Sequence, residues 1–286
     1  MGFTGECRPG ILASRPAPVQ VNYLGFPGTM GAPHIDYILA DRSVITEESR
    51  HHYVETVAYL PHSYLPNDAT RAISRHTPTR AEAGLPETSF VFASFNNSYK
   101  FTPEIFDVWM RLLRDIGGSV LWLAEPNQAA ERNLQREAQA RGIAGERLVF
   151  APFAARAEDH LARLTLADLF LDTLPYNAHA TACDALWVGL PVLTCQGTTF
   201  AGRVGASLLN ALGFPELIAK SLDEYETLAL KYARSPAPLA ALKDKLANNR
   251  NTRPLFDTAR FTRGLESIFV KMWDRHQKGL APGPLD

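Results

Sequence analysis

Apolar and polar positions follow a regular order along the chain from about residue 89 onward. Short apolar runs bounded by polar or turn-forming residues predict buried strands at 89–95, 119–125, 147–153, 167–173, 191–195 and 216–219. The segments between them carry apolar residues at helical spacing and predict helices at 102–117, 127–142, 156–166, 180–189, 199–213 and 222–235, with two more at 237–277. Such alternation is typical of βαβ units. We therefore expect an α/β, Rossmann-like domain of about 200 residues, whose parallel sheet has helices on both faces.

The helix predicted at 102–117 carries clear start and stop signals. Thr102 is a suitable N-cap, Pro103 fits the first helical position, and Gly117 ends the pattern. Parallel sheets of this kind bind ligands beyond the carboxyl ends of their strands. That rule selects the loops after residues 95, 125, 152, 174 and 195.

The N-terminal part of the chain has a different pattern. Apolar runs predict strands at 19–26, 34–41 and 55–61 and a short helix at 46–54, and a polar linker follows at 66–89. These elements are too few to bury a core alone, and the Gly- and Pro-rich opening resembles the middle of a domain. We expect residues 1–78 to be part of one lobe with a linker, and residues 79–286 to form a second, complete lobe.

Composition narrows the class of protein. The chain has 286 residues, 46% hydrophobic and 21% charged, which suits a globular protein with a sizeable core. A net charge of -1 gives no support for a nucleic-acid or membrane-surface partner. No apolar run approaches the ~18 residues of a membrane span, and no signal sequence is evident. The three cysteines fit a reducing compartment, so we expect a cytoplasmic protein.

Polar groups gather where a helix is predicted to begin near Ala180. A helix N-terminus presents free N–H groups and a partial positive charge, which together hold phosphate. His179 precedes this helix and Thr181 lies in its first turn, so both could contact the same anion, although Thr181 could equally serve as a helix cap. Asp184 lies on the same face as Thr181, and a ribose diol is a natural donor to its carboxylate.

Two further groups lie at predicted strand ends. Asn97 and Lys100 follow the strand at 89–95 and could contact a phosphate, or remain solvated. His160 and Arg163 are one helical turn apart and could stack on a flat base and reach its edge, or line a solvated helix face. Glycine-rich dinucleotide, Walker A, nucleophile-elbow and Asp-x-Asp motifs are all missing. A nucleotide diphosphate would then be neutralised by protein groups, with no metal and no cofactor, and an NAD-dependent dehydrogenase is disfavoured.

Several segments together carry a resemblance to a known family. They read LGFPGTMGAPHIDYILAD, FNNSYK, LWLAEPN, LADLFLDTLPYNAHATACDALWVGLPVLT and GRVGASLLNALGFPELIAK. The chain, from about residue 10 to residue 275, closely resembles the C-terminal catalytic region of the bacterial type of O-linked N-acetylglucosamine (O-GlcNAc) transferases, in which tetratricopeptide repeats precede a glycosyltransferase region. The resemblance implies a GT-B fold with a complete C-terminal lobe and a partial N-terminal lobe. It also implies inverting, metal-independent transfer of N-acetylglucosamine from UDP-GlcNAc to Ser or Thr hydroxyls of a protein acceptor.

The resemblance also implies roles for single residues. Those at the pyrophosphate are His179, Ala180, Thr181, Asn97 and Lys100. Lys100 is the implied catalytic residue, because it stabilises the leaving phosphate. Ala180 and Asn97 stand where relatives often have threonine and glutamine.

Other implied contacts concern the nucleoside and the sugar. Asp184 contacts the ribose, His160 stacks on uracil and Arg163 lies at its edge. The backbone near Ala154 also reads uracil. Arg156 stands roughly where a ribose-contacting lysine is expected. Leu24 and Gly25 lie near the sugar.

The part of the family absent from this sequence leaves alternatives open. The first half of the N-terminal lobe and the upstream tetratricopeptide repeats do not occur, so we expect a fragment of a longer enzyme. A truncated, non-catalytic nucleotide-sugar-binding remnant is the alternative, and an interaction module that has lost its ligand is a third reading. Retention of the implied donor-binding residues argues against the third.

Overall fold

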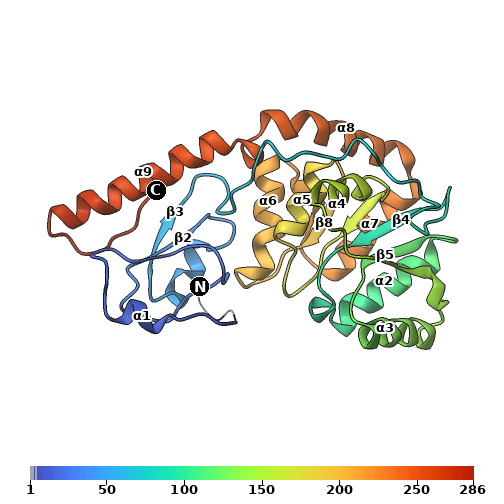
Figure 1. The fold of residues 1–286 in the computed structure, drawn as a ribbon, viewed down its shortest axis with the longest axis horizontal. Coiled ribbons are helices and arrows are strands. Elements are labelled where there is room, and N and C mark those ends of the chain that lie inside the picture. Colours follow the sequence, from blue (N-terminus) through green and yellow to red (C-terminus); the bar gives the residue numbers. More distant parts are fainter. Residues whose placement is uncertain (1–2, 4) are drawn as a thin grey trace.

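The computed structural model describes residue 3 and residues 5–286, which form two lobes, each built on a parallel sheet (Figure 1). The sheet of the first lobe has the order β1-β2-β3, with β1 at Val21–Asn22, β2 at Tyr37–Ala40 and β3 at Thr56–Tyr59. The short elements around it are α1 (Gly10–Ala13) and the 3-10 helix η1 (Glu47–His52). The strand predicted at 19–26 is shorter than expected, because Leu24 and Gly25 adopt positive φ angles of 55° and 99° that no strand accommodates.

The second lobe contains a six-stranded sheet with the order β6-β5-β4-β7-β8-β9. Its strands are β4 (Val91–Ser94), β5 (Val120–Ala124), β6 (Leu148–Ala151), β7 (Leu169–Leu171), β8 (Val192–Cys195) and β9 (Ile218–Ala219). All neighbours pair in parallel. The chain starts at the central strand β4 and adds β5 and β6 on one side of it. It then returns to add β7, β8 and β9 on the other side of β4. The order reverses between β4 and β7, the place where doubly wound sheets hold ligands. The predicted α/β class is confirmed.

Helices cover the second sheet on both faces (Figure 1). They are α2 (Pro103–Asp115), α3 (Gln128–Ala140), α4 (Ala157–Leu164), α5 (Ala180–Trp187), α6 (Val204–Leu212), α7 (Leu222–Arg234) and α8 (Pro236–Thr252). Helix α2 begins as the sequence predicts, since the Thr102 hydroxyl accepts a hydrogen bond from the backbone N–H of Ile105 at 3.4 Å. The helix predicted at 199–213 begins instead with a 3-10 turn, η4 (Ala201–Arg203), before α6. Single 3-10 turns also occur at η2 (Ser98–Lys100), η3 (Gly145–Arg147), η5 (Pro215–Leu217) and η6 (Pro254–Phe256).

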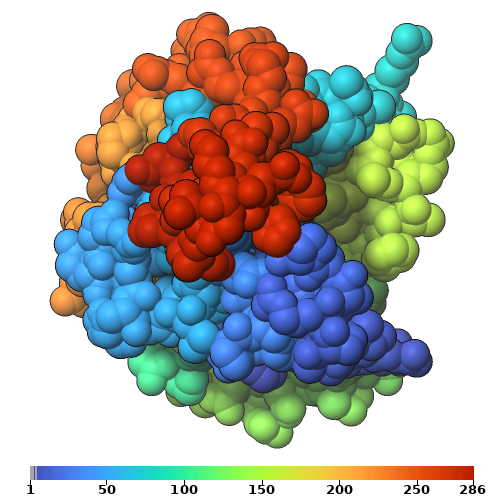
Figure 2. All heavy atoms as spheres, turned by 90° about the vertical axis from the view of Figure 1, so that its left-hand side faces the viewer, coloured from blue at the N-terminus to red at the C-terminus, as the bar shows by residue number. Residues whose placement is uncertain are grey.

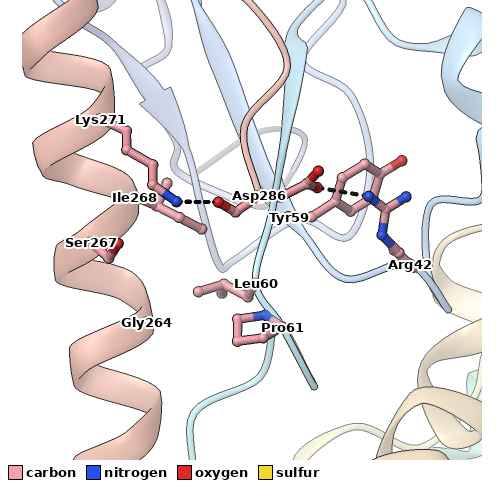
Figure 3. A pocket seen from close by; sticks show the side chains of 9 residues that line it. All are labelled: Arg42, Tyr59, Leu60, Pro61, Gly264, Ser267, Ile268, Lys271 and Asp286. Carbon is pink, nitrogen blue, oxygen red and sulfur yellow. Dashed lines mark hydrogen bonds and ion pairs between the residues drawn. The ribbon is translucent and has the colours of Figure 1, made fainter.

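The C-terminal helix α9 (Thr258–Gln277) leaves the second lobe and lies along the first (Figures 1 and 2). The tail that follows it runs beside β3, where the N–H of Tyr59 donates to the carbonyl of Leu285 at 2.8 Å. In Figure 3, Arg42 and Lys271 both point toward Asp286, and Arg42 pairs with its carboxylate at 2.8 Å. The chain therefore closes the edge of the first sheet with its own tail. The division into 1–78 and 79–286 stays a prediction.

Besides α9, a linker and a buried hydrogen bond connect the lobes. The linker at 66–89 contains no helix or strand. At the junction, the buried carboxylate of Asp41 accepts hydrogen bonds from the hydroxyl of Ser207 at 2.6 Å and from the N–H of Tyr64 at 2.8 Å. The bond from Ser207 links the segment directly after β2 to helix α6. Across residue 3 and residues 5–286, no helix combines the length and the apolar character that a bilayer span requires.

Candidate functional site

The carboxyl ends of β7 and β8 are organised by a buried aspartate, Asp172. Its carboxylate accepts hydrogen bonds from the N–H groups of Ala178 at 2.6 Å and Thr173 at 2.7 Å, and from the hydroxyl of Thr194 at 2.6 Å. Burial raises the pKa of Asp172 to about 6, although these hydrogen bonds act to lower it. Asp172 thus fixes the loop at 173–179. Sequence reasoning missed it, although a carboxylate that ends an apolar run was a usable signal.

Lys100 lies at this point, between two strand ends. Its ammonium donates to the side-chain oxygen of Asn96 at 3.0 Å and to the carbonyl of Asn177 at 2.9 Å. It also lies 4.4 Å from the centre of the Tyr176 ring. Burial lowers the pKa of Lys100, and the charge of Asp172 opposes that change. An ammonium has three N–H donors. Among the described residues only two hydrogen bonds engage it, so one N–H remains for a ligand oxygen.

The two asparagines after β4 have different surroundings. Asn96 is buried, and its side-chain oxygen accepts from Lys100 and, at 3.5 Å, from the hydroxyl of Thr181. Its amide nitrogen is buried without a partner among the described residues. Asn97 is exposed and donates to the hydroxyl of Tyr99 at 3.4 Å. The sequence analysis singled out Asn97 and missed Asn96, which joins Lys100 to the start of helix α5.

His179 occupies the N-cap position of α5, directly before Ala180. Its ring stacks on Tyr176 with centroids 5.0 Å apart. Burial and then the charge of Lys100 lower the pKa of His179 to about 4, against a hydrogen bond to the carbonyl of Ala201. Nε2 is buried and has no partner among the described residues, so it is available to a ligand.

His160 and Arg163 lie together, as their helical spacing predicts. The guanidinium of Arg163 contacts Nδ1 of His160 at 3.0 Å and donates to the carbonyl of Pro152. Nδ1 therefore acts as the acceptor, and Nε2 carries the proton. Nε2 lies 3.8 Å from the carboxylate of Asp184. Burial, followed by the charge of Arg163, lowers the pKa of His160, while Asp184 opposes that change.

A cavity of about 480 Å³ opens beside this pair. Its lining includes Phe95, Asn97, Ala154, His160 and Arg163. Ala154, His160 and Arg163, the residues expected to contact the uracil base, therefore border one cavity. Arg156 is engaged elsewhere, because its largely exposed side chain pairs with Glu158 and Asp159 of its own helix.

Leu24 and Gly25 lie on a tight turn of the first lobe. The buried carboxylate of Glu55 holds the following loop, accepting from the N–H of Met30 at 2.6 Å and from the hydroxyl of Thr29. A cavity of about 570 Å³ separates residues 26–29 of this loop from residues 198–200 of the second lobe. Residues 26–29 thus face the second lobe across this cavity, whereas Leu24 and Gly25, directly before them, are not among its lining residues. Sequence reasoning missed Glu55.

The sequence matches the family described as glycosyl transferase family 41 over residues 1–77 and 70–265. The chain belongs to glycosyl transferase family 41. A bacterial structure agrees with this family-41 assignment: a mutant of the Thermobaculum terrenum O-GlcNAc transferase is 33% identical, with a TM-score of 0.85, and the match covers 94% of this chain and 51% of that one. The GT-B fold expected from the resemblance is confirmed.

Curated family-41 relatives cover nearly the whole chain. A probable UDP-N-acetylglucosamine–peptide N-acetylglucosaminyltransferase from Arabidopsis thaliana, SEC, is 40% identical over 98% of this chain. SPINDLY from Solanum lycopersicum, whose name carries the same probable activity, is 34% identical over 98% of this chain. The chain spans only 29% and 30% of these two proteins.

Proposed function

We propose that this protein is the donor-binding part of a glycosyltransferase that moves N-acetylglucosamine from UDP-GlcNAc to Ser or Thr hydroxyls of proteins. The observation that carries the proposal is the placement of Lys100 beside the first turn of α5 at the strand-order reversal, with one N–H that no described residue engages. A fixed cation and helix N–H groups suit a pyrophosphate. The names of the relatives support the choice of donor and acceptor.

The proposed reaction is a single displacement that inverts the anomeric carbon. The oxygen of the acceptor hydroxyl forms a bond to that carbon while the bond to the β-phosphate oxygen breaks; UDP leaves, and the hydroxyl proton is released to solvent. Negative charge then grows on the leaving phosphate, where Lys100 and the N–H groups of Ala180 and Thr181 stabilise it. Stabilisation that strengthens toward the transition state raises the rate. The protein's own cations take the place of a metal in this scheme.

The nucleoside is proposed to occupy the cavity beside His160. Its uracil stacks on that ring, with Arg163 and the backbone near Ala154 at its edge, and its ribose meets Asp184. The sugar extends toward Leu24 and Gly25. Upstream tetratricopeptide repeats and a cytoplasmic location belong to the same proposal.

A transfer assay tests the proposed function. Labelled UDP-GlcNAc and mixed protein acceptors are incubated with the 286-residue chain, with and without the upstream catalytic region of a family-41 relative. UDP-glucose and UDP-galactose serve as competing donors. We expect preferential use of UDP-GlcNAc in the complemented reaction and little transfer by the chain alone, because acceptor positioning needs both walls of the cleft.

The outcomes of that assay separate the alternatives. Donor binding without transfer in the complemented reaction favours the second candidate, a non-catalytic nucleotide-sugar-binding protein, which the short span relative to SEC keeps open. Robust transfer by the chain alone contradicts a site split between two lobes. Preference for another donor sugar refutes the assignment of UDP-GlcNAc.

A further inference from the structure

Arg71 lies in the irregular linker between the lobes, yet its side chain is only 24% exposed. Its guanidinium forms an ion pair with Asp184 and donates to the carbonyl of Cys183 at 3.4 Å. It also lies 5.4 Å from the centre of the Trp187 ring, whose N–H donates to the carbonyl of Arg71 at 3.2 Å. Four contacts with residues of helix α5 therefore hold this linker residue in place.

These contacts decide how the carboxylate of Asp184 is presented. One oxygen faces Arg71, and the other faces Nε2 of His160 at 3.8 Å. A carboxylate has about four acceptor positions on its two oxygens, so hydroxyl groups of a ligand can still bind. With Arg71 and His160 on either side, the plane of the carboxylate is fixed before a ligand arrives. A preorganised acceptor binds a diol better than one that rotates freely.

The charge of Arg71 has a second consequence. A carboxylate close to a diphosphate repels it, and the cation paired with Asp184 offsets that repulsion. The described part of the chain offers the carboxylate no other Arg or Lys ion pair. Loss of Arg71 would leave a rotating, unneutralised carboxylate at the place where the ribose is proposed to lie.

We propose that Arg71 is a positioning residue that gives the site its preference for a nucleotide with an intact ribose diol. It acts through Asp184 and need not touch the ligand. The inference rests on the proposed function, in which a UDP-sugar binds here. Because Arg71 belongs to the linker, it also makes nucleoside recognition depend on how the linker packs against the second lobe.

The test compares two ligands, UDP and 2′,3′-dideoxy-UDP, by calorimetric titration of the whole chain. The variant is Arg71→Gln, and Asp184→Asn is the reference for complete loss of the carboxylate. Arg80→Gln is the matched control, because Arg80 lies in the same linker and pairs with Asp168 at 2.9 Å with similar burial. That control pair lies at the amino end of β7, away from the proposed ligand. Thermal melting without ligand shows that each variant is folded.

We expect the parent and Arg80→Gln to prefer UDP over the dideoxy analogue. Arg71→Gln should lose roughly tenfold of that preference, the scale of one charge-assisted hydrogen bond. Its affinity for the dideoxy analogue should fall much less than its affinity for UDP, because that ligand loses only the offset of repulsion between Asp184 and the diphosphate. Arg71→Lys keeps the charge without the planar fork, so its preference should lie between those of the parent and Arg71→Gln.

Two results overturn the inference while UDP still binds the parent. One is an unchanged preference in Arg71→Gln. The other is an equal weakening of both ligands, which would mean that Arg71 supports the fold or offsets charge at the diphosphate and does not act on the diol contact. Failure of the parent to bind UDP at all would instead refute the proposed function, and the inference would fall with it.

Discussion

Replacement of Lys100 by methionine should weaken UDP binding by about one to two orders of magnitude. Methionine retains most of the apolar stem and removes the ammonium, which has two acceptors and one unengaged N–H among the described residues. A hydrogen bond from a charged group contributes about 1.5–3 kcal/mol. That range corresponds to a rise in Kd of about 10- to 150-fold. Turnover should fall further, by about 2–4 kcal/mol in activation free energy, because charge on the leaving phosphate grows toward the transition state.

Calorimetric titration with UDP measures the binding part of this prediction. The matched control is Lys245→Met on helix α8, because that ammonium also pairs with an oxygen, from Glu216, and lies 4.4 Å from the centre of an aromatic ring, Phe214. A thermal melt of each variant separates loss of binding from loss of fold. If Lys100→Met and Lys245→Met both bind UDP within twofold of the parent, the role assigned to Lys100 is wrong.

Two further predictions concern the scaffold of the site. Because the pKa of His179 falls to about 4 from an ordinary ~6.5, its contribution to stability is present above pH 6.5 and lost as the pH falls toward 4. Urea titrations at pH 7 and at pH 4.5 give the drop in unfolding free energy that acidification causes. That drop should be about 2 kcal/mol smaller in His179→Gln than in the parent. Equal drops in the two proteins would contradict this prediction. The raised pKa of Asp172 changes stability with pH in the opposite direction, but it does so equally in both proteins and cancels in the comparison. A methyl group on Gly205 would lie 2.6 Å from the Asp172 carboxylate and crowd the Thr194 hydroxyl, so Gly205→Ala should cost about 1–3 kcal/mol or more of stability. The control is Gly117→Ala, whose added methyl group would point into open space and should cost less than about 1 kcal/mol. Similar losses of unfolding free energy for the two variants in urea denaturation would refute the packing argument.

The second sheet could be predicted from the sequence because its strands are buried on both faces. Such strands appear as unbroken apolar runs, and β4 and β8 are buried at every position. The first lobe was harder to predict. Strand β1 is only two residues long, since the backbone turns at Leu24. Turn geometry of this kind leaves little trace in an apolar pattern, so the boundary could not be read from it.

Contacts in the candidate site could be predicted only between residues that lie close together in the sequence. His160 and Arg163 lie one helical turn apart, so their contact follows from spacing alone. Asn96 and Asn97 are chemically identical neighbours, and only the folded sheet decides which one is buried beside Lys100. Arg71 meets Asp184 across 113 positions of sequence. No periodicity reports such a contact, because it depends on the path of a linker that has no regular structure.

Binding of UDP by the 286-residue chain tests the central claim most directly. The titration is performed with EDTA present and then with added Mg²⁺. We expect one UDP bound per chain, with the same Kd in both conditions, because Lys100 and the start of helix α5 neutralise the diphosphate without a metal. No detectable binding at millimolar UDP, or binding that appears only with Mg²⁺, would contradict it.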